Sequence, residues 1–132
     1  MITIQGELYS SKNSREIKFN RKTKKMFVGK SDVSYNNEKD LLQILPLYRQ
    51  KFLSMLEGKE KPYRIGFKIY RKTKRRFDYI NIVQNIFDCM VKSGWLEDDD
   101  ANNVIPFFEP YEVDPKNPRV DIFIIDNINK PW

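Results

Sequence analysis

The sequence predicts an α+β fold in which two main helices pack on one mixed or antiparallel sheet. The order of the periodic segments indicates this class, because strand-like alternation comes before, between and after two segments of helical spacing. The composition is that of a globular protein, with 40% hydrophobic residues and only 12 Gly and Pro together. With 132 residues and no shift of composition that would mark a linker, we expect residues 1–132 to form one domain.

The first part of the chain is expected to hold a strand, a hairpin and an interrupted helix. Ile2, Ile4 and Leu8 alternate with polar residues, as in a first strand. Apolar residues on both sides of the stretch NRKTKK predict a hairpin with a basic tip, which solvation alone would explain. Helical spacing then extends from residue 41 to residue 56. Because proline lacks an amide donor and clashes with the preceding turn, Pro46 predicts a break near residue 45, with the stronger helix at 46–56.

The second part begins with a strand and a helix. Alternation over residues 63–70 predicts a strand with one buried face, which leads directly into the basic run RKTKRR. From Ile82 to Val91 the apolar positions follow a helical period, and Gly94 closes the helix. Asp88 and Lys92 are four residues apart on its polar stripe, so we expect a surface ion pair between them.

Two further strands are expected near the C-terminus. Residues 104–108 are strand-like, but Pro106 indicates an edge or irregular strand. Residues 107–119 are then expected to form a loop. The segment 120–125 is the most hydrophobic strand of the chain, and we expect both of its faces to be covered.

The residue types that are missing restrict the chemistry. The chain has no histidine, which excludes histidine zinc ligands, nucleophile pairs with histidine and histidine general bases. Cys89 is the only cysteine and lies among apolar helix positions, so a buried structural thiol is expected and an internal disulfide is excluded. Catalysis would therefore depend on carboxylates, lysines, hydroxyls or a hard metal ion. The apolar runs are too short to cross a membrane, and we expect a cytoplasmic protein.

The charge is strongly polarised along the chain. Residues 1–76 hold 20 Lys and Arg against 7 Asp and Glu, whereas residues 77–132 hold 4 against 11. A basic surface of this kind can collect a polyanion, and an acidic part can hold divalent cations against it. The alternative is that the two halves intermix in space and their fields cancel.

The region from residue 71 to residue 104 concentrates this contrast. Its basic run contributes Lys72, Lys74, Arg75 and Arg76, and an isolated Asp78 follows at the start of the predicted helix. Beyond the helix comes the acidic cluster of residues 97–100. Clustered carboxylates are costly unless they are solvated or bind a metal ion, so metal-dependent chemistry on nucleic acid is the first hypothesis. The alternatives are a helix N-cap for Asp78 and a solvated turn for the cluster.

Several motifs in this order resemble those of a known family. They are Arg75-Arg76-Phe77-Asp78 with Asn81, a helix ending at Lys92-Ser93-Gly94, the pair Asp98-Asp99, Pro118-Arg119-Val120, and the early loop Ser11-Lys12-Asn13-Ser14. Together they resemble the RusA family of Holliday junction resolvases, over nearly the whole chain. The resemblance implies a magnesium-dependent, structure-selective endodeoxyribonuclease of DNA recombination and repair. Such an enzyme acts as a homodimer on branched DNA at four-way junctions.

The resemblance also implies roles for individual residues. Asp78, Asp98 and Asp99 would be catalytic and would hold Mg²⁺, for which Mn²⁺ can substitute. Asp100 is an extra acid of this chain in the same turn and is a further candidate metal ligand. The DNA backbone would be bound by the cations Lys12, Arg15, Lys72, Lys74, Arg75 and Arg76. Two residues depart from the family pattern, since Ile80 stands in place of the second Asp of D-x-D-N and Gln84 in place of a lysine. Losing a carboxylate removes both a charge and a ligand. Asp100 or Glu97 is a candidate to compensate for the missing carboxylate.

Two other hypotheses remain open. One is a nucleic-acid-binding protein of the same fold that has lost efficient cleavage through Ile80. The other is an interaction or inhibitor protein of a mobile element, for which the acidic residues are only surface. The nuclease hypothesis requires Asp78 to lie within a few ångströms of residues 98–100, inside one subunit or across a dimer contact.

Overall fold

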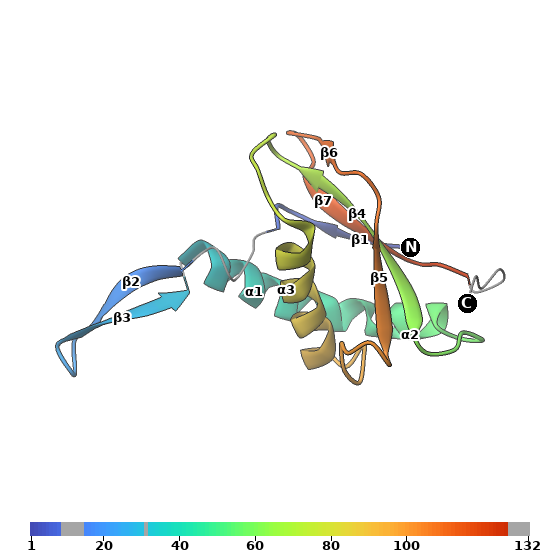
Figure 1. Cartoon of the computed structure of the whole chain (residues 1–132), viewed down its shortest axis with the longest axis horizontal. Helices are drawn as coiled ribbons and strands as arrows, with labels where there is room; N and C mark the ends of the chain where they lie inside the picture. The colour runs from blue at the N-terminus through green and yellow to red at the C-terminus, as the bar shows by residue number, and fades with distance from the viewer. Residues whose placement is uncertain (9–14, 31, 127–132) are drawn as a thin grey trace.

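The structure is a computed structural model, and it describes residues 1–8, 15–30 and 32–126. It confirms a mixed α+β architecture (Figure 1). The main sheet has the strand order β1 (Ile2–Gln5), β7 (Arg119–Ile124), β4 (Tyr63–Arg71) and β5 (Val104–Phe108). β7 is antiparallel to both β1 and β4, whereas β4 and β5 are parallel, so the sheet is mixed.

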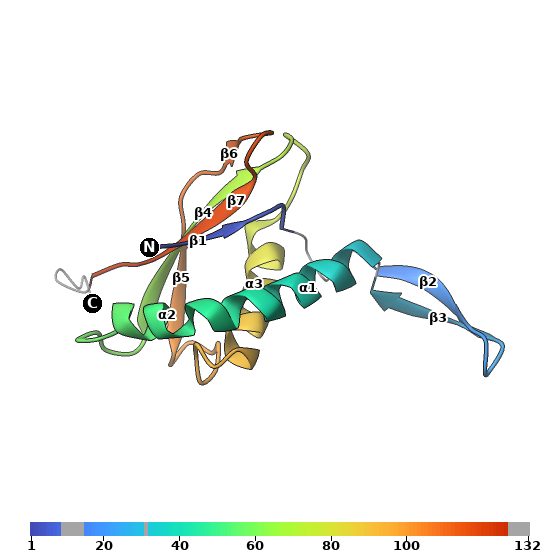
Figure 2. The same ribbon diagram turned by 180° about the vertical axis from the view of Figure 1, so that it is seen from behind.

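The predicted hairpin is present as a separate two-stranded sheet. β2 (Arg15–Asn20) and β3 (Lys25–Lys30) pair antiparallel over six residues each. After the hairpin, α1 (Asp32–Ile44), the 3-10 turn η1 (Leu45–Tyr48) and α2 (Arg49–Met55) form one bent rod that passes along the sheet (Figure 2). The break near residue 45 is confirmed, with Pro46 in the 3-10 turn. The expectation that the stronger helix follows Pro46 is wrong, because α1 has 13 residues and α2 only 7.

The second main helix, α3 (Tyr79–Lys92), follows β4 and packs against the same core as α1. Phe67 of β4 meets Phe87 of α3 edge to face, with ring centroids 5.5 Å apart. Trp95, just beyond α3, stacks on Phe52 of α2 and donates its indole N–H to the carbonyl of Leu45 at 2.8 Å. Cys89, the only cysteine of the sequence, is buried, as expected.

Three local expectations are corrected. β4 lies between two strands and is buried on both faces over its first half, including Arg64 and Gly66, so it does not have a single buried face. β7 buries Val120 and Ile122 fully but leaves Asp121 and the residues beyond Ile122 only partly covered. The expected loop at 107–119 contains the short strand β6 (Glu112–Val113), which pairs with the end of β4.

The edge position expected for the strand with Pro106 is confirmed, since β5 is the last strand of the sheet path. Among the described residues, no helix is long and apolar enough to cross a membrane.

Candidate functional site

The cations between β4 and α3 form an exposed loop, here called the basic segment (residues 72–76). Lys72, Lys74, Arg75 and Arg76 are all exposed. The Thr73 hydroxyl accepts a hydrogen bond from the backbone N–H of Arg75 at 3.3 Å, which gives the loop a local turn. Of the six residues predicted to bind DNA, these four are therefore neighbours on one accessible loop. Arg15 is the first residue of β2, and Lys12 lies outside the described residues.

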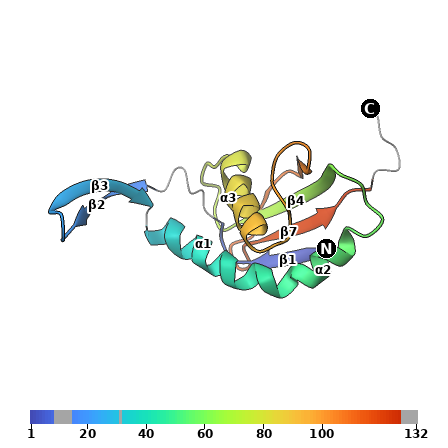
Figure 3. The same ribbon diagram turned by 90° about the horizontal axis from the view of Figure 1, so that it is seen from below.

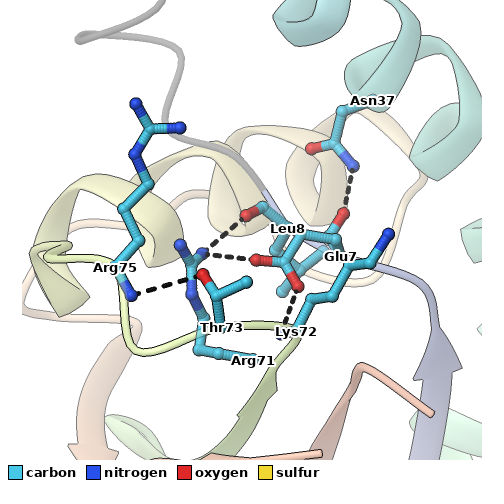
Figure 4. A network of polar contacts seen from close by, with 7 residues as sticks. All are labelled: Glu7, Leu8, Asn37, Arg71, Lys72, Thr73 and Arg75. Atoms are coloured by element: carbon cyan, nitrogen blue, oxygen red, sulfur yellow. Dashed lines mark hydrogen bonds and ion pairs between the residues drawn. The ribbon is translucent and has the colours of Figure 1, made fainter. Parts of the chain in front are cut away.

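A buried ion pair anchors the basic segment at its start (Figure 4). The Arg71 guanidinium lies 3.2 Å from the Glu7 carboxylate, with 9% and 14% of the two side chains exposed, and donates to the carbonyl of Leu8 at 3.0 Å. The second oxygen of Glu7 accepts the backbone N–H of Lys72 at 2.8 Å. Asn37 of α1 donates to the Glu7 carbonyl at 3.4 Å. The segment after β1, the end of β4 and α1 are thus joined at the point where the cations begin.

Sequence reasoning missed this anchor. Arg71 was part of the basic run, but its burial was not foreseen. The alternation of β4 offered a signal, because Arg71 continues the series of inward positions Ile65, Phe67 and Ile69. The guanidinium also lies over the ring of Phe77, 4.5 Å from its centroid.

Asp78 occupies the N-cap position of α3 with extended backbone angles (φ −109°, ψ 126°). Its side chain makes no capping hydrogen bond to the helix backbone. The structure therefore does not show the helix-capping carboxylate that was the alternative role for Asp78. One oxygen accepts a hydrogen bond from the Asn81 side-chain amide at 3.2 Å. Asp78 is exposed, and it lies directly after the basic segment. Ile80, two residues on, is an exposed hydrophobic residue with 71% of its surface accessible.

The acidic turn (residues 97–100) lies beyond the other end of α3, and all its residues are exposed. Two of its acids already have protein partners. Glu97 pairs with Lys61 at 3.0 Å. Asp100 accepts both the backbone N–H of Asn103 at 3.2 Å and its side-chain amide at 2.7 Å, as in a capped turn. Neither Glu97 nor Asp100 is therefore an obvious substitute for a carboxylate at position 80.

The other two acids of the turn interact with each other. Asp98 accepts the backbone N–H of Asp99 at 2.8 Å. Partial burial raises the pKa of Asp99, and a hydrogen bond with Asp98 and the charge of Asp88 raise it further. Asp88, near the end of α3, is thus an acidic neighbour of the turn. The expected Asp88–Lys92 ion pair is not formed, because Lys92 reaches across to Glu38 of α1 at 2.9 Å.

One chain does not bring Asp78 and the acidic turn together. They lie at opposite ends of α3, as Figure 1 shows, and a helix of 14 residues is about 21 Å long at 1.5 Å per residue. Within residues 1–8, 15–30 and 32–126, no group of three or more acidic or cysteine side chains has the geometry to hold a metal ion. A shared ion would require a second subunit.

Comparisons with known proteins leave the family open. No family model matches the chain, and no curated protein matches it.

Proposed function

We propose that this protein is a RusA-like, Mg²⁺-dependent endodeoxyribonuclease that acts on branched DNA as a homodimer. The support for DNA as the substrate is the basic segment, whose four exposed cations lead directly to the exposed carboxylate of Asp78. Cations of this kind bind the phosphate backbone, while a carboxylate beside them can hold the metal ion that activates water.

The observation that carries the proposal is a stripe of accessible side chains along α3. It contains Ile80, Gln84, Asp88 and Val91, which are spaced by three or four residues and lie at least partly exposed. The stripe begins two residues after Asp78 and ends at Val91, six residues before the first residue of the acidic turn. Ile80, at the start of the stripe, is a large exposed apolar residue, and such a residue is more favourably placed in a protein interface than in water.

Two copies of α3 packed antiparallel along this stripe would complete the metal sites. Such a contact has two-fold symmetry, so each pairing occurs twice. Gln84 would face the partner subunit's Asp88, and the N-terminus of each helix would lie level with the C-terminus of the other. At an interaxial distance of about 8 to 10 Å, Asp78 would approach the partner's Asp98 and Asp99. The dimer would then carry two identical sites, as symmetric cutting of two strands requires.

The proposal is tested by complementation between two inactive variants. Asp78→Asn and Asp99→Asn are each expected to abolish Mg²⁺-dependent cleavage of a synthetic four-way junction and to leave binding intact. Mixed dimers of the two variants retain one site with both carboxylates if the site spans the interface. Remixing by mild denaturation and refolding should then recover about a quarter of wild-type activity, since about half of the dimers are mixed and each has one intact site of two.

Wild-type protein carried through the same refolding is the control. Absence of recovery, with wild-type activity unaffected by refolding, would exclude a site shared between subunits. Wild-type protein that binds junctions but neither cleaves them nor binds Mg²⁺ or Mn²⁺ in calorimetry would exclude the nuclease.

A second candidate function is DNA binding without cleavage, which the exposed Ile80 favours because a metal ligand is missing there. Ile80→Asp restores the carboxylate, and Ile80→Asn is the matched neutral control. If cleavage increases in Ile80→Asp and not in Ile80→Asn, the wild type is an enzyme weakened at this position. If neither variant cleaves, the binding function is favoured.

A further inference from the structure

The β2–β3 hairpin stands away from the main sheet (Figures 1 and 3). Its tip carries a cluster of cations. Its six paired residues per strand give a reach of about 20 Å at 3.3 Å per residue. β2 and β3 pair with no other described strand. Isolated two-stranded hairpins are only marginally stable in water, so a ribbon of this kind is best explained by a partner that it holds.

The tip of the hairpin (residues 20–26) is built to present positive charge. Arg21, Lys22, Lys24 and Lys25 are all exposed, and no acidic residue lies between Asn20 and Met26. None of the ion pairs found between described side chains involves these four cations. The tip therefore offers four charges within five residues to an anionic partner.

The turn at the hairpin tip places a lysine at a position where glycine would fold more easily. Asn20 accepts the backbone N–H groups of Lys22 at 2.9 Å and Thr23 at 3.2 Å, which closes the turn. Lys24 then has φ 55°, in the left-handed region that glycine adopts without cost and a lysine does not. A glycine would make the easier turn, yet the position carries a cation.

The hairpin is linked to the basic segment through α1. Only residue 31 separates β3 from α1, and Asn37 of α1 donates to the Glu7 carbonyl. Glu7 in turn accepts the backbone N–H of Lys72, the first cation of the basic segment. Figure 4 shows Glu7 between Asn37 of α1 and Lys72. The two basic regions are therefore connected by α1 and the residues around Glu7.

We propose that the hairpin is a DNA-binding arm that lies along a duplex flanking the branch, with its tip cations on the phosphates that border a groove. The proposal rests on DNA as the partner in the proposed function. A two-stranded ribbon fits the major groove of duplex DNA, and basic side chains at its tip would reach the flanking phosphates. The basic segment would hold the branch while the arm extends along one of its duplexes.

The test is the salt dependence of junction binding by the triple variant Lys22→Gln/Lys24→Gln/Lys25→Gln. Each phosphate contact contributes about 0.9 to the slope of log K against log salt. Three lost contacts in each subunit, or six per dimer, should therefore lower the slope by about 5 on a junction with long duplex arms. On a junction with arms of about 4 base pairs, at 3.4 Å per pair, the duplex is about 14 Å long and ends short of the arm's reach of about 20 Å, so the difference should largely disappear.

A control variant removes the same charge elsewhere on the exposed surface. It carries the substitutions Lys39→Gln, Lys51→Gln and Lys116→Gln. Its slope should change by less than about 1 on both junctions, because general loss of charge affects the slope less than loss of phosphate contacts. Lys24→Gly is a further variant that eases the turn. It should fold at least as well as wild type and still lower the slope by about 2, because one contact is lost in each of the two subunits.

The outcomes separate this inference from the proposed function. If wild type binds junctions and the tip variant shows an unchanged slope, the arm does not contact DNA, whereas the proposed function stands. If wild type binds no DNA at any salt concentration, both fail. If the tip variant loses dimer mass in light scattering while monomer binding to DNA keeps its slope, the arm holds a second copy of the chain and the inference is overturned.

Discussion

The buried pair between Arg71 and Glu7 gives the sharpest stability prediction, through the substitution Glu7→Gln. The two charged groups lie 3.2 Å apart, with 9% and 14% of their side chains exposed. The Nε atom of Arg71 is buried without a hydrogen-bond partner, so the guanidinium depends on Glu7 and the Leu8 carbonyl. Glutamine keeps the shape of glutamate and one acceptor oxygen, but it leaves the cation uncompensated.

The expected cost follows from the distance and the burial. Two unit charges at 3.2 Å attract by about 5 kcal/mol at an effective dielectric constant near 20. Breaking a buried pair by removing one partner costs about 3 to 5 kcal/mol, and the remaining amide oxygen places Glu7→Gln near the lower value. A loss of about 3 kcal/mol is large against the 5 to 15 kcal/mol typical of a folded domain. Urea unfolding of wild type and variant measures it directly.

Glu97→Gln is the matched control. Glu97 forms a surface ion pair with Lys61 at a similar distance of 3.0 Å, and 82% of the Glu97 side chain is exposed. Exposed pairs contribute about 0 to 1 kcal/mol. If Glu7→Gln costs no more than Glu97→Gln, the reasoning from burial is refuted. The double variant Glu7→Leu/Arg71→Met should recover part of the loss, since it leaves no buried charge.

Three further predictions concern the core and the acidic turn. Asp99→Asn should raise the melting temperature at pH 7, because burial raises the pKa of Asp99 and so disfavours its ionised form in the folded protein. The gain in melting temperature should vanish below about pH 3.5, where the carboxyl group is protonated in the unfolded protein as well. Gly66→Ala should lower the free energy of unfolding in urea by about 1 to 3 kcal/mol, because the added methyl group would overlap the ring of Phe123. Gly58→Ala is the control: its methyl group meets no atom, so any loss of stability comes from the backbone angle alone. Trp95→Phe should cost about 1 to 3 kcal/mol, because it leaves the buried Leu45 carbonyl without its donor, and an unchanged unfolding midpoint would contradict this.

Part of the candidate site could be predicted from sequence and part could not. The basic segment was predictable, because four cations in five residues after a strand are exposed in almost any fold. The separation of Asp78 from the acidic turn also follows from local structure, since a 14-residue helix between them fixes the distance. Burial of Arg71 and the choice of Glu38 as the partner of Lys92 were not predictable, because both depend on which element packs opposite.

The sequence by itself determined where the helices and strands lie and where they are interrupted. Alternation and helical spacing located the strands and helices, Pro46 marked the break in the rod and Pro106 the edge strand, because these signals depend only on neighbouring residues. Only the tertiary structure decided that α3 keeps an exposed stripe from Ile80 to Val91 and that Glu7 is buried against Arg71. Those features depend on contacts between residues distant in the chain, which local periodicity does not encode.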